Sequence, residues 1–92
     1  MKQLILEHAA FNTAYVDLTA GRYLVKASSH NWSGVTITPK AEIITEVALK
    51  DVLGNTISFT ANAYFVFEFS GRITFDGTLG HGKTVTLEFI RL

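Results

Sequence analysis

Residues 22–28 read Arg-Tyr-Leu-Val-Lys-Ala-Ser, and their alternating pattern decides the fold class. The apolar side chains at positions 23, 25 and 27 point to one face of an extended chain, and the polar ones at 22, 26 and 28 point to the other. This two-residue period is that of a half-buried β-strand, in which Leu24 is the one exception. The stretch therefore predicts a strand with one face against a core.

Comparable short runs recur along the rest of the chain at roughly ten-residue spacing. Thr, Val and Ile number 25 of the 92 residues, and there is one Pro, a composition typical of β-proteins. We expect an all-β single domain over residues 1–92, a two-sheet antiparallel β-sandwich of jelly-roll type with about eight strands. The expected strands are 3–7, 13–18, 22–28, 35–38, 41–52, 56–60, 63–70, 72–75 and 83–91.

Two segments of the sequence allow alternative interpretations. Residues 41–52 fit both a helical and a strand period, and their β-branched residues favour the strand. Leu18–Val25 aligns with Phe59–Val66 at an offset of 41, with four identities in eight positions. The alignment predicts two copies of a four-strand unit, although strand-turn-strand segments also converge by chance.

Composition and charge exclude several classes of function. Eight basic and eight acidic residues give zero net charge, so we expect no nucleic-acid partner. The absence of Cys excludes disulfides and thiolate metal sites and agrees with folding inside a cell. The start of the chain lacks the apolar stretch of an export signal. The apolar run 61–69 is interrupted by Asn62 and Glu68 and is too short for a membrane helix, so we expect no membrane partner.

The segment Gly77–Thr84 reads GTLGHGKT and matches the phosphate-binding loop pattern letter for letter. In that loop, backbone amides hold the phosphates at the start of a helix that begins at the Lys-Thr pair. Here the residues after Thr84 read as a strand, and no later strand supplies a magnesium-binding Asp. We therefore expect a glycine-rich hairpin loop and no nucleotide hydrolysis.

The remaining ionisable residues do not form a recognisable catalytic or metal-binding pattern. His8, His30 and His81 lie far apart without an acidic partner at metal-ligand spacing, so we expect no metal and no cofactor. The three Asp residues at strand ends or turns, 17, 51 and 76, are read as turn formers. A glycosidase pair among the Glu residues at 42, 46, 68 and 88 is not visible from spacing alone, but so short a chain leaves little room for a cleft. No catalytic residue is predicted, and the protein is not expected to be an enzyme.

Two features point instead to binding. The strand 63–69 is apolar on both faces, with Phe65 and Phe67 on one and Tyr64 and Val66 on the other. One face fills the core, and the second needs a cover, either a loop of the same chain or a neighbouring subunit. Trp32 lies in a polar loop, where it either anchors a partner or closes the end of the sandwich. These five residues are the candidate interface.

The order of these patterns resembles that of small tailed-bacteriophage virion proteins over residues 14–91. The residues that carry the likeness are LTAGRYLV at 18–25, the Ser-rich loop with WSG at 32–34, VTIT at 35–38, TANAY at 60–64 and VTLEFIR at 85–91. The resemblance implies a β-sandwich capsid decoration or head-fibre protein. Such a protein assembles as a symmetric oligomer, often a trimer, on the capsid surface and has no catalytic residues.

The leading hypothesis is a non-enzymatic virion structural protein, assembled in the host cytoplasm, that self-associates and docks on the capsid or another virion protein. A homo-oligomer is expected, with a trimer favoured. The alternative is a carbohydrate-binding β-sandwich module in which Trp32, together with Tyr15 or Tyr23, forms a stacking platform for a sugar ring.

Overall fold

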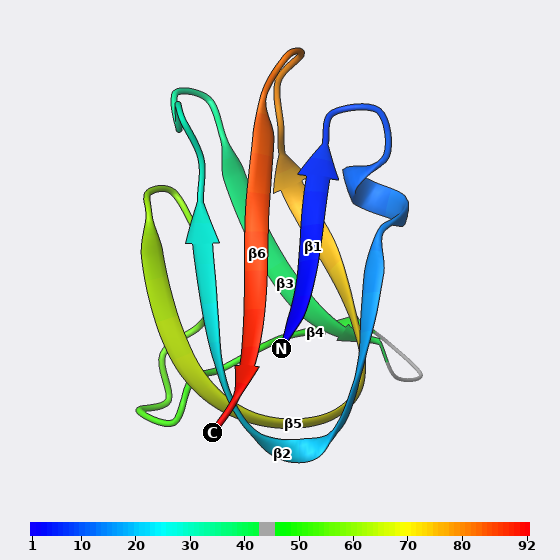
Figure 1. Ribbon diagram of the computed structural model, residues 1–92, viewed down its shortest axis with the longest axis vertical. Helices are drawn as coiled ribbons and strands as arrows, with labels where there is room; N and C mark the ends of the chain where they lie inside the picture. Colours follow the sequence, from blue (N-terminus) through cyan, green and yellow to red (C-terminus); the bar gives the residue numbers. More distant parts are fainter. Residues whose placement is uncertain (43–45) are drawn as a thin grey trace.

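The computed structural model describes residues 1–42 and 46–92, and in this part of the chain six strands form one antiparallel sheet (Figure 1). The order of strands across the sheet is β1-β6-β2-β5-β3-β4. A single 3-10 turn, Phe11–Thr13, connects β1 to β2. The strands are β1 (Lys2–Glu7), β2 (Tyr15–Ser28), β3 (Thr36–Glu42), β4 (Glu46–Ala48), β5 (Ala63–Thr78) and β6 (Thr84–Arg91).

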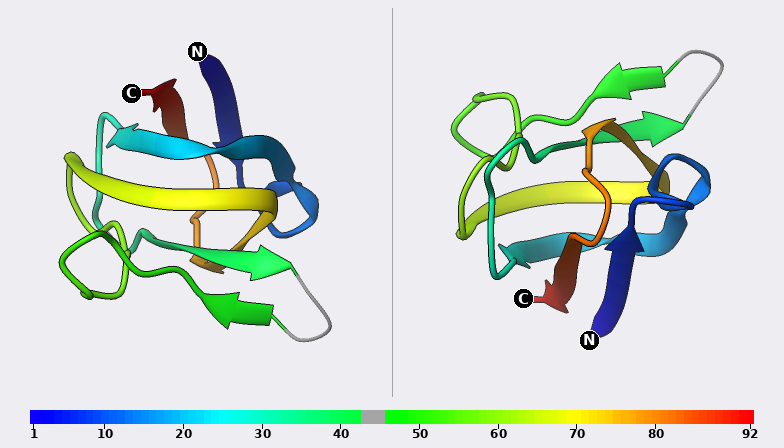
Figure 2. Two further views of the ribbon diagram at one scale, coloured as in Figure 1. Left: turned by 90° about the horizontal axis from the view of Figure 1, so that it is seen from below. Right: turned by 90° about the horizontal axis from the view of Figure 1, so that it is seen from above.

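The two longest strands bend the sheet over its own core. The pairing of β2 with β5 shifts register between Leu18 and Gly21, and on β5 the bend contains Gly71, whose φ is 125°. Such a bulge and a glycine with positive φ let a strand change direction without losing its partner. Figure 1 shows β2 and β5 sweeping together through a U at one end of the molecule. Seen from below, β1 and β6 lie on one side and β3 and β4 on the other (Figure 2).

The inner faces of the two halves enclose one hydrophobic core. The alternation predicted for residues 22–28 is confirmed, since Tyr23, Val25 and Ala27 are all buried. Two aromatic pairs fill the centre: the Phe67 and Phe89 ring centroids lie 6.5 Å apart, and Phe59 meets Phe65 edge-on at 5.2 Å. The largest fully buried side chains are Phe59, Phe67, Phe89, Leu6, Ile37, Ile57, Ile73, Leu79, Leu87, Val25 and Val85.

The all-β prediction is confirmed, but the strand count and the separation into sheets differ from expectation. The expected strands 13–18 and 22–28 are one strand, β2, and 63–70 and 72–75 are one strand, β5. The strand breaks predicted at Gly21 and Gly71 are wrong, because both glycines lie at bends within continuous strands. Residues 56–60 form only bridges, Lys50 with Thr56 and Ile37 with Phe59, in place of a full strand. One continuous sheet thus takes the place of two.

The predicted repeat has no structural counterpart. Its first copy lies wholly within β2, and its second copy crosses the bend that leads into β5. Gly21 allows the Arg91 side chain to lie close to the backbone of β2, because a Cβ at position 21 would lie 2.9 Å from Cζ of Arg91. The single strand predicted over 41–52 is wrong as such: residues 41–42 end β3, 46–48 form the antiparallel β4, 49–52 are outside the strands, and 43–45 lie outside the described residues. The extended conformation favoured over a helix is confirmed for 41–42 and 46–48.

Candidate functional site

An apolar row crosses the outer face of the sheet, on the half formed by β6, β2 and the first part of β5. The pairing places Leu24 directly between Ile90 of β6 and Val66 of β5. Ile90 is 36% exposed, and the other two side chains are half-buried. Leu24, the exception to the alternation in β2, thus belongs to an apolar row on the solvent side. We refer to Leu24, Val66 and Ile90 as the apolar row.

Long and polar side chains border the apolar row along its two sides. Next to it, Lys26 pairs in register with Tyr64 and Glu88, and the Tyr64 side chain is exposed. On the other side, Arg22 forms an ion pair with Glu68, with 2.6 Å between Nη2 and Oε1. This arrangement, an apolar centre with a polar rim, has the composition of protein interfaces.

A loop extends the apolar surface at the free edge of β5. The amide of Val52 donates a hydrogen bond of 2.9 Å to the carbonyl oxygen of Val66. The Asp51 carboxylate accepts from the amides of Leu53 and Asn55 at 3.0 and 2.9 Å, so the predicted turn-forming role of Asp51 is confirmed. This turn holds Leu53 82% exposed to solvent. Apolar side chains are therefore present both on the face and at the edge of β5.

The structure separates the five residues of the candidate interface. Tyr64 and Val66 lie on the outer face, as expected. Phe67 is 1% exposed and is not available to a partner, and Phe65 is partly buried and packs against the same core. Strand alternation explains the difference, because positions 65 and 67 face inward whenever 64 and 66 face outward. Trp32 packs partly against the core, and its Nε1 donates to Oδ1 of Asn62 at 2.6 Å.

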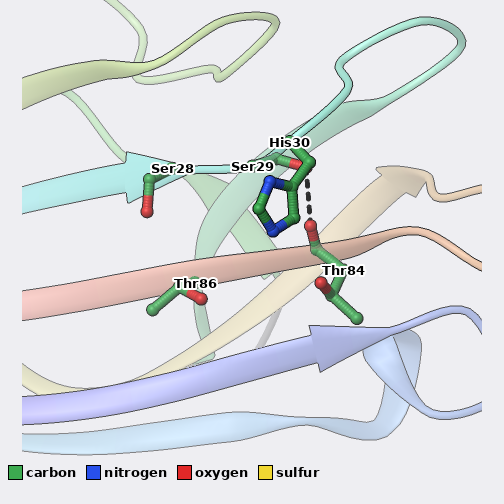
Figure 3. Close-up of a pocket in the computed structure, with 5 residues that line it drawn as sticks. All are labelled: Ser28, Ser29, His30, Thr84 and Thr86. Carbon is green, nitrogen blue, oxygen red and sulfur yellow. Dashed lines mark hydrogen bonds between the residues drawn. The ribbon is translucent and has the colours of Figure 1, made fainter.

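The aromatic platform for a sugar ring is not assembled. Tyr23 is buried, and its hydroxyl donates to the carbonyl oxygen of Thr19 at 2.6 Å. The ring of Tyr15 lies beneath the guanidinium of Arg72, 3.9 Å from its Cζ. A shallow pocket of about 300 Å³ opens near the end of β2, where it is lined by Ser28, Ser29, His30, Thr84 and Thr86 (Figure 3). Its lining contains no Phe, Tyr or Trp side chain that could stack on a sugar ring.

The glycine-rich segment does not form a phosphate-binding loop. Thr84 begins strand β6, so no helix N-terminus points at the loop. A Cβ on Gly77 would lie 1.9 Å from the carbonyl oxygen of Thr36, which shows that this glycine allows β3 and β5 to approach each other. The ammonium of Lys83 donates to the carbonyl oxygen of Ser33. The segment is the turn between β5 and β6, as the sequence predicted.

His8 and His81 lie in contact, although they are far apart in the sequence. The rings of His8 and His81 are 3.7 Å apart at their centroids, and Nδ1 of His8 lies 2.5 Å from the carbonyl oxygen of Leu79. His30 lies in the pocket of Figure 3. Within residues 1–42 and 46–92, no three His, Asp or Glu side chains are grouped in a way that could hold a metal ion.

Charged residues gather on the outer face of the other half of the sheet. Arg72 donates to both carboxylate oxygens of Asp17, at 2.8 and 3.2 Å, and this hydrogen bonding lowers the pKa of Asp17 and raises that of Arg72. Lys40 lies 3.0 Å from Asp76, and its hydrogen bond, together with that from the amide of Gly77, lowers the pKa of Asp76. Asp17 is thus an ion-pair partner across two strands, not the turn former that was expected.

No protein-family model matches this chain, and neither the curated proteins nor the solved structures that were compared with it contain a match. Among the described residues there is no helix long and apolar enough to cross a membrane.

Proposed function

We propose that this protein is a non-enzymatic structural subunit of a phage particle, of the capsid decoration or head-fibre kind that its sequence resembles. It would self-associate, most simply as a trimer, and dock on the capsid or on another virion protein after assembly in the host cytoplasm. The observation that carries the proposal is the apolar row of Leu24, Val66 and Ile90 on the solvent side of three adjacent strands.

A second copy of this chain is the occupant that the surface favours. Full burial of one Leu, Ile or Val side chain contributes about 1.5–3 kcal/mol. Leu24, Val66 and Ile90 are already partly buried, so an interface over them gains only part of this value for each side chain. The rim offers both signs of charge, since Arg22 and Lys26 lie beside Glu68 and Glu88. A surface with both signs can meet its own copy without a net repulsion.

The proposal extends to the architecture. We infer that the bent sheet works as a two-layer sandwich, because the U of β2 and β5 places its halves on opposite sides of one core. Each half then presents an outer face to its surroundings. An assembly subunit needs such faces to contact its neighbours, whereas it needs no catalytic cleft.

The solution mass tests self-association directly. We expect sedimentation equilibrium or light scattering of the full chain to give a multiple of the 10.1 kDa monomer mass, three for a trimer. Val66→Glu places a charge at one end of the apolar row, next to Leu24, and should yield the monomer. Val47→Glu is the matched control, because Val47 is an exposed valine on β4, away from the row, and should leave the mass unchanged.

A strict monomer at all concentrations would refute self-association through the apolar row. Loss of assembly in both variants would show that the substitutions destabilise the fold in general. If only Val66→Glu is monomeric and the two variants have equal melting temperatures, general destabilisation is excluded. Docking is tested separately by co-sedimentation with phage capsids that lack decoration, where Val47→Glu should bind as the unmodified protein does. Absence of binding to any such capsid would count against the virion assignment.

A further inference from the structure

Strand β1 lies at the end of the sheet and has a neighbouring strand on one side only. Within residues 1–42 and 46–92, its backbone pairs with β6, and no other strand pairs with its second edge. Figure 2 shows the start of β1 at the margin of the molecule, next to the end of β6. An open edge of this kind offers a row of unpaired amide and carbonyl groups to another extended chain.

The other edges of the bent sheet are protected. Along the first part of β5, the amide of Val52 donates to the carbonyl oxygen of Val66 at 2.9 Å. Along the part of β2 that pairs only with β5, the ammonium of Lys2 donates to the carbonyl oxygen of Asp17. Strand β4, at the remaining edge, is only three residues long. Short strands and covering groups are common protections of a sheet edge, so β1 differs from the other edges.

The middle of β1 has no comparable protection, and the whole of this strand is described. Its register with β6 is continuous, and residues 3–6 read Gln-Leu-Ile-Leu, with neither a charge nor a proline. Leu6 is fully buried and Leu4 packs against the core, so these two side chains point inward and Ile5 points outward. Ile5 is 57% exposed. The strand is thus regular, apolar and open, which favours pairing with another strand.

The side chains of β1 match those of a second copy in one register. Antiparallel pairing around a two-fold axis places residues of the same face opposite each other. With Ile5 at the axis, this residue meets its own copy and Leu4 meets Leu6. Gln3 then lies opposite Glu7, and its side-chain amide can donate to the carboxylate. With the axis at Leu4 or Leu6, Ile5 would lie opposite a polar residue, so the register centred on Ile5 is favoured.

We propose that β1 of one molecule pairs antiparallel with β1 of a second copy, around a two-fold axis at Ile5. The layer formed by β1, β6 and the adjoining parts of β2 and β5 then continues from one molecule into the next. This contact goes beyond the assembly through the apolar row, because β1 contributes no residue to that row.

The β1 contact is weak by itself. One pair of six-residue strands covers less than the roughly 800 Å² per partner that is typical of stable complexes. It therefore forms in concentrated solution, and the Val66→Glu variant remains a monomer in dilute solution. Between oligomers held by the apolar row, several β1 contacts act together and strengthen one another.

Single cysteines test the register, because the chain contains none of its own. Opposite residues of an antiparallel pair have Cα atoms about 4.5–5.5 Å apart, a separation that a disulfide spans. In concentrated solution, oxidation of Ile5→Cys should give a covalent dimer several-fold faster than oxidation of Val47→Cys, an exposed control on β4. Gln3→Cys lies about 14 Å along the strand from its own copy in this register and should stay at the control rate. Mixed with Glu7→Cys, it should form the mixed dimer.

Equal rates for Ile5→Cys, Gln3→Cys and Val47→Cys would overturn the proposal, because they indicate chance collision. Faster cross-linking of Gln3→Cys than of Ile5→Cys would also overturn it, since this requires another register. The Ile5→Cys rate in the Val66→Glu background separates the two contacts. A rate that stays above the control supports the β1 pairing even if the apolar row does not assemble the protein. A rate that falls to the control shows that the cross-link depends on the apolar row and overturns the proposal.

Discussion

Replacing Thr74 with valine should stabilise this protein, although the change removes a polar group from a strand in the middle of the sheet. The Oγ1 of Thr74 is covered and has no hydrogen-bond partner in the described structure. Folding therefore takes the hydroxyl away from water and returns no bond. Valine has nearly the same shape and is at least as well suited to a β-strand, so the backbone pairing with Tyr15 and Lys40 should be kept.

The magnitude follows from the cost of a buried unpaired group. Leaving a buried donor or acceptor unsatisfied costs about 1–3 kcal/mol, and part of this cost is relieved if the hydroxyl reaches water by small motions. We therefore expect a gain of about 1 kcal/mol. For a domain of this size, that gain raises the melting temperature by about 4–8 °C.

Thermal and urea unfolding, followed by circular dichroism, measure this change. Thr38→Val is the matched control, because Thr38 Oγ1 lies 3.3 Å from Oγ of Ser58 and its removal breaks a hydrogen bond. The control should lose about 0.5–1.5 kcal/mol. If Thr74→Val is destabilised as much as the control, then the hydroxyl of Thr74 has a partner in solution and the reasoning is refuted.

Further predictions concern the turn of β5, the ion pair on β2 and the assembly surface. Gly77→Ala should unfold the protein or lower its stability by more than about 3 kcal/mol, because its Cβ would lie 1.9 Å from the Thr36 carbonyl oxygen. Gly82→Ala has free space around its Cβ and should cost only about 1 kcal/mol, from its positive φ. Equal melting temperatures of the two variants would contradict this prediction. The pKa of Asp17 is lowered by Arg72, so its stabilisation is present above the unfolded value near 3.9 and is lost as the pH falls through the folded value. Asp17→Asn should therefore be less stable than the unmodified protein at neutral pH and equal to it in strong acid, and parallel melting curves from pH 7 to 2 would disprove the linkage. Val66→Glu should give the monomer mass in sedimentation, and retention of the oligomer would exclude the apolar row as its interface.

The sequence predicts those features that depend on local pattern. Alternation in residues 22–28 locates the buried face of β2 because each side chain's direction follows from its neighbour's. The prediction that residues 77–84 do not form a phosphate-binding loop also depends on local alternation, because Thr84 begins a strand whose side chains alternate. The strand breaks predicted at Gly21 and Gly71 are wrong, because a glycine at the end of a strand and a glycine at a bend within one give the same sequence pattern. Only the pairing with the partner strand distinguishes them.

The candidate sites depend on register, which no local pattern contains. The apolar row consists of positions 24, 66 and 90. It can be recognised only from the strand pairing, which places Leu24 opposite both Val66 and Ile90. The charged side chains on the opposite outer face likewise come together from separate strands, since Arg72 of β5 lies between Asp17 of β2 and Glu42 of β3 in the register. The sequence signal for the outer face is Leu24, an apolar residue on the polar side of an alternating strand.

The bend in β2 and β5 gives the molecule two separate outer faces. A flat six-stranded sheet would have one apolar face to cover and one face for every other purpose. Because the sheet folds on itself at Gly21 and Gly71, its inner faces cover each other, and two separate outer faces result. One carries the apolar row, and the other carries the ion pairs of Asp17 with Arg72 and of Lys40 with Asp76. A subunit held by its neighbours through the apolar row would keep the charged face in solvent, so Asp17→Asn should leave the oligomer mass unchanged and Val66→Glu should lower it.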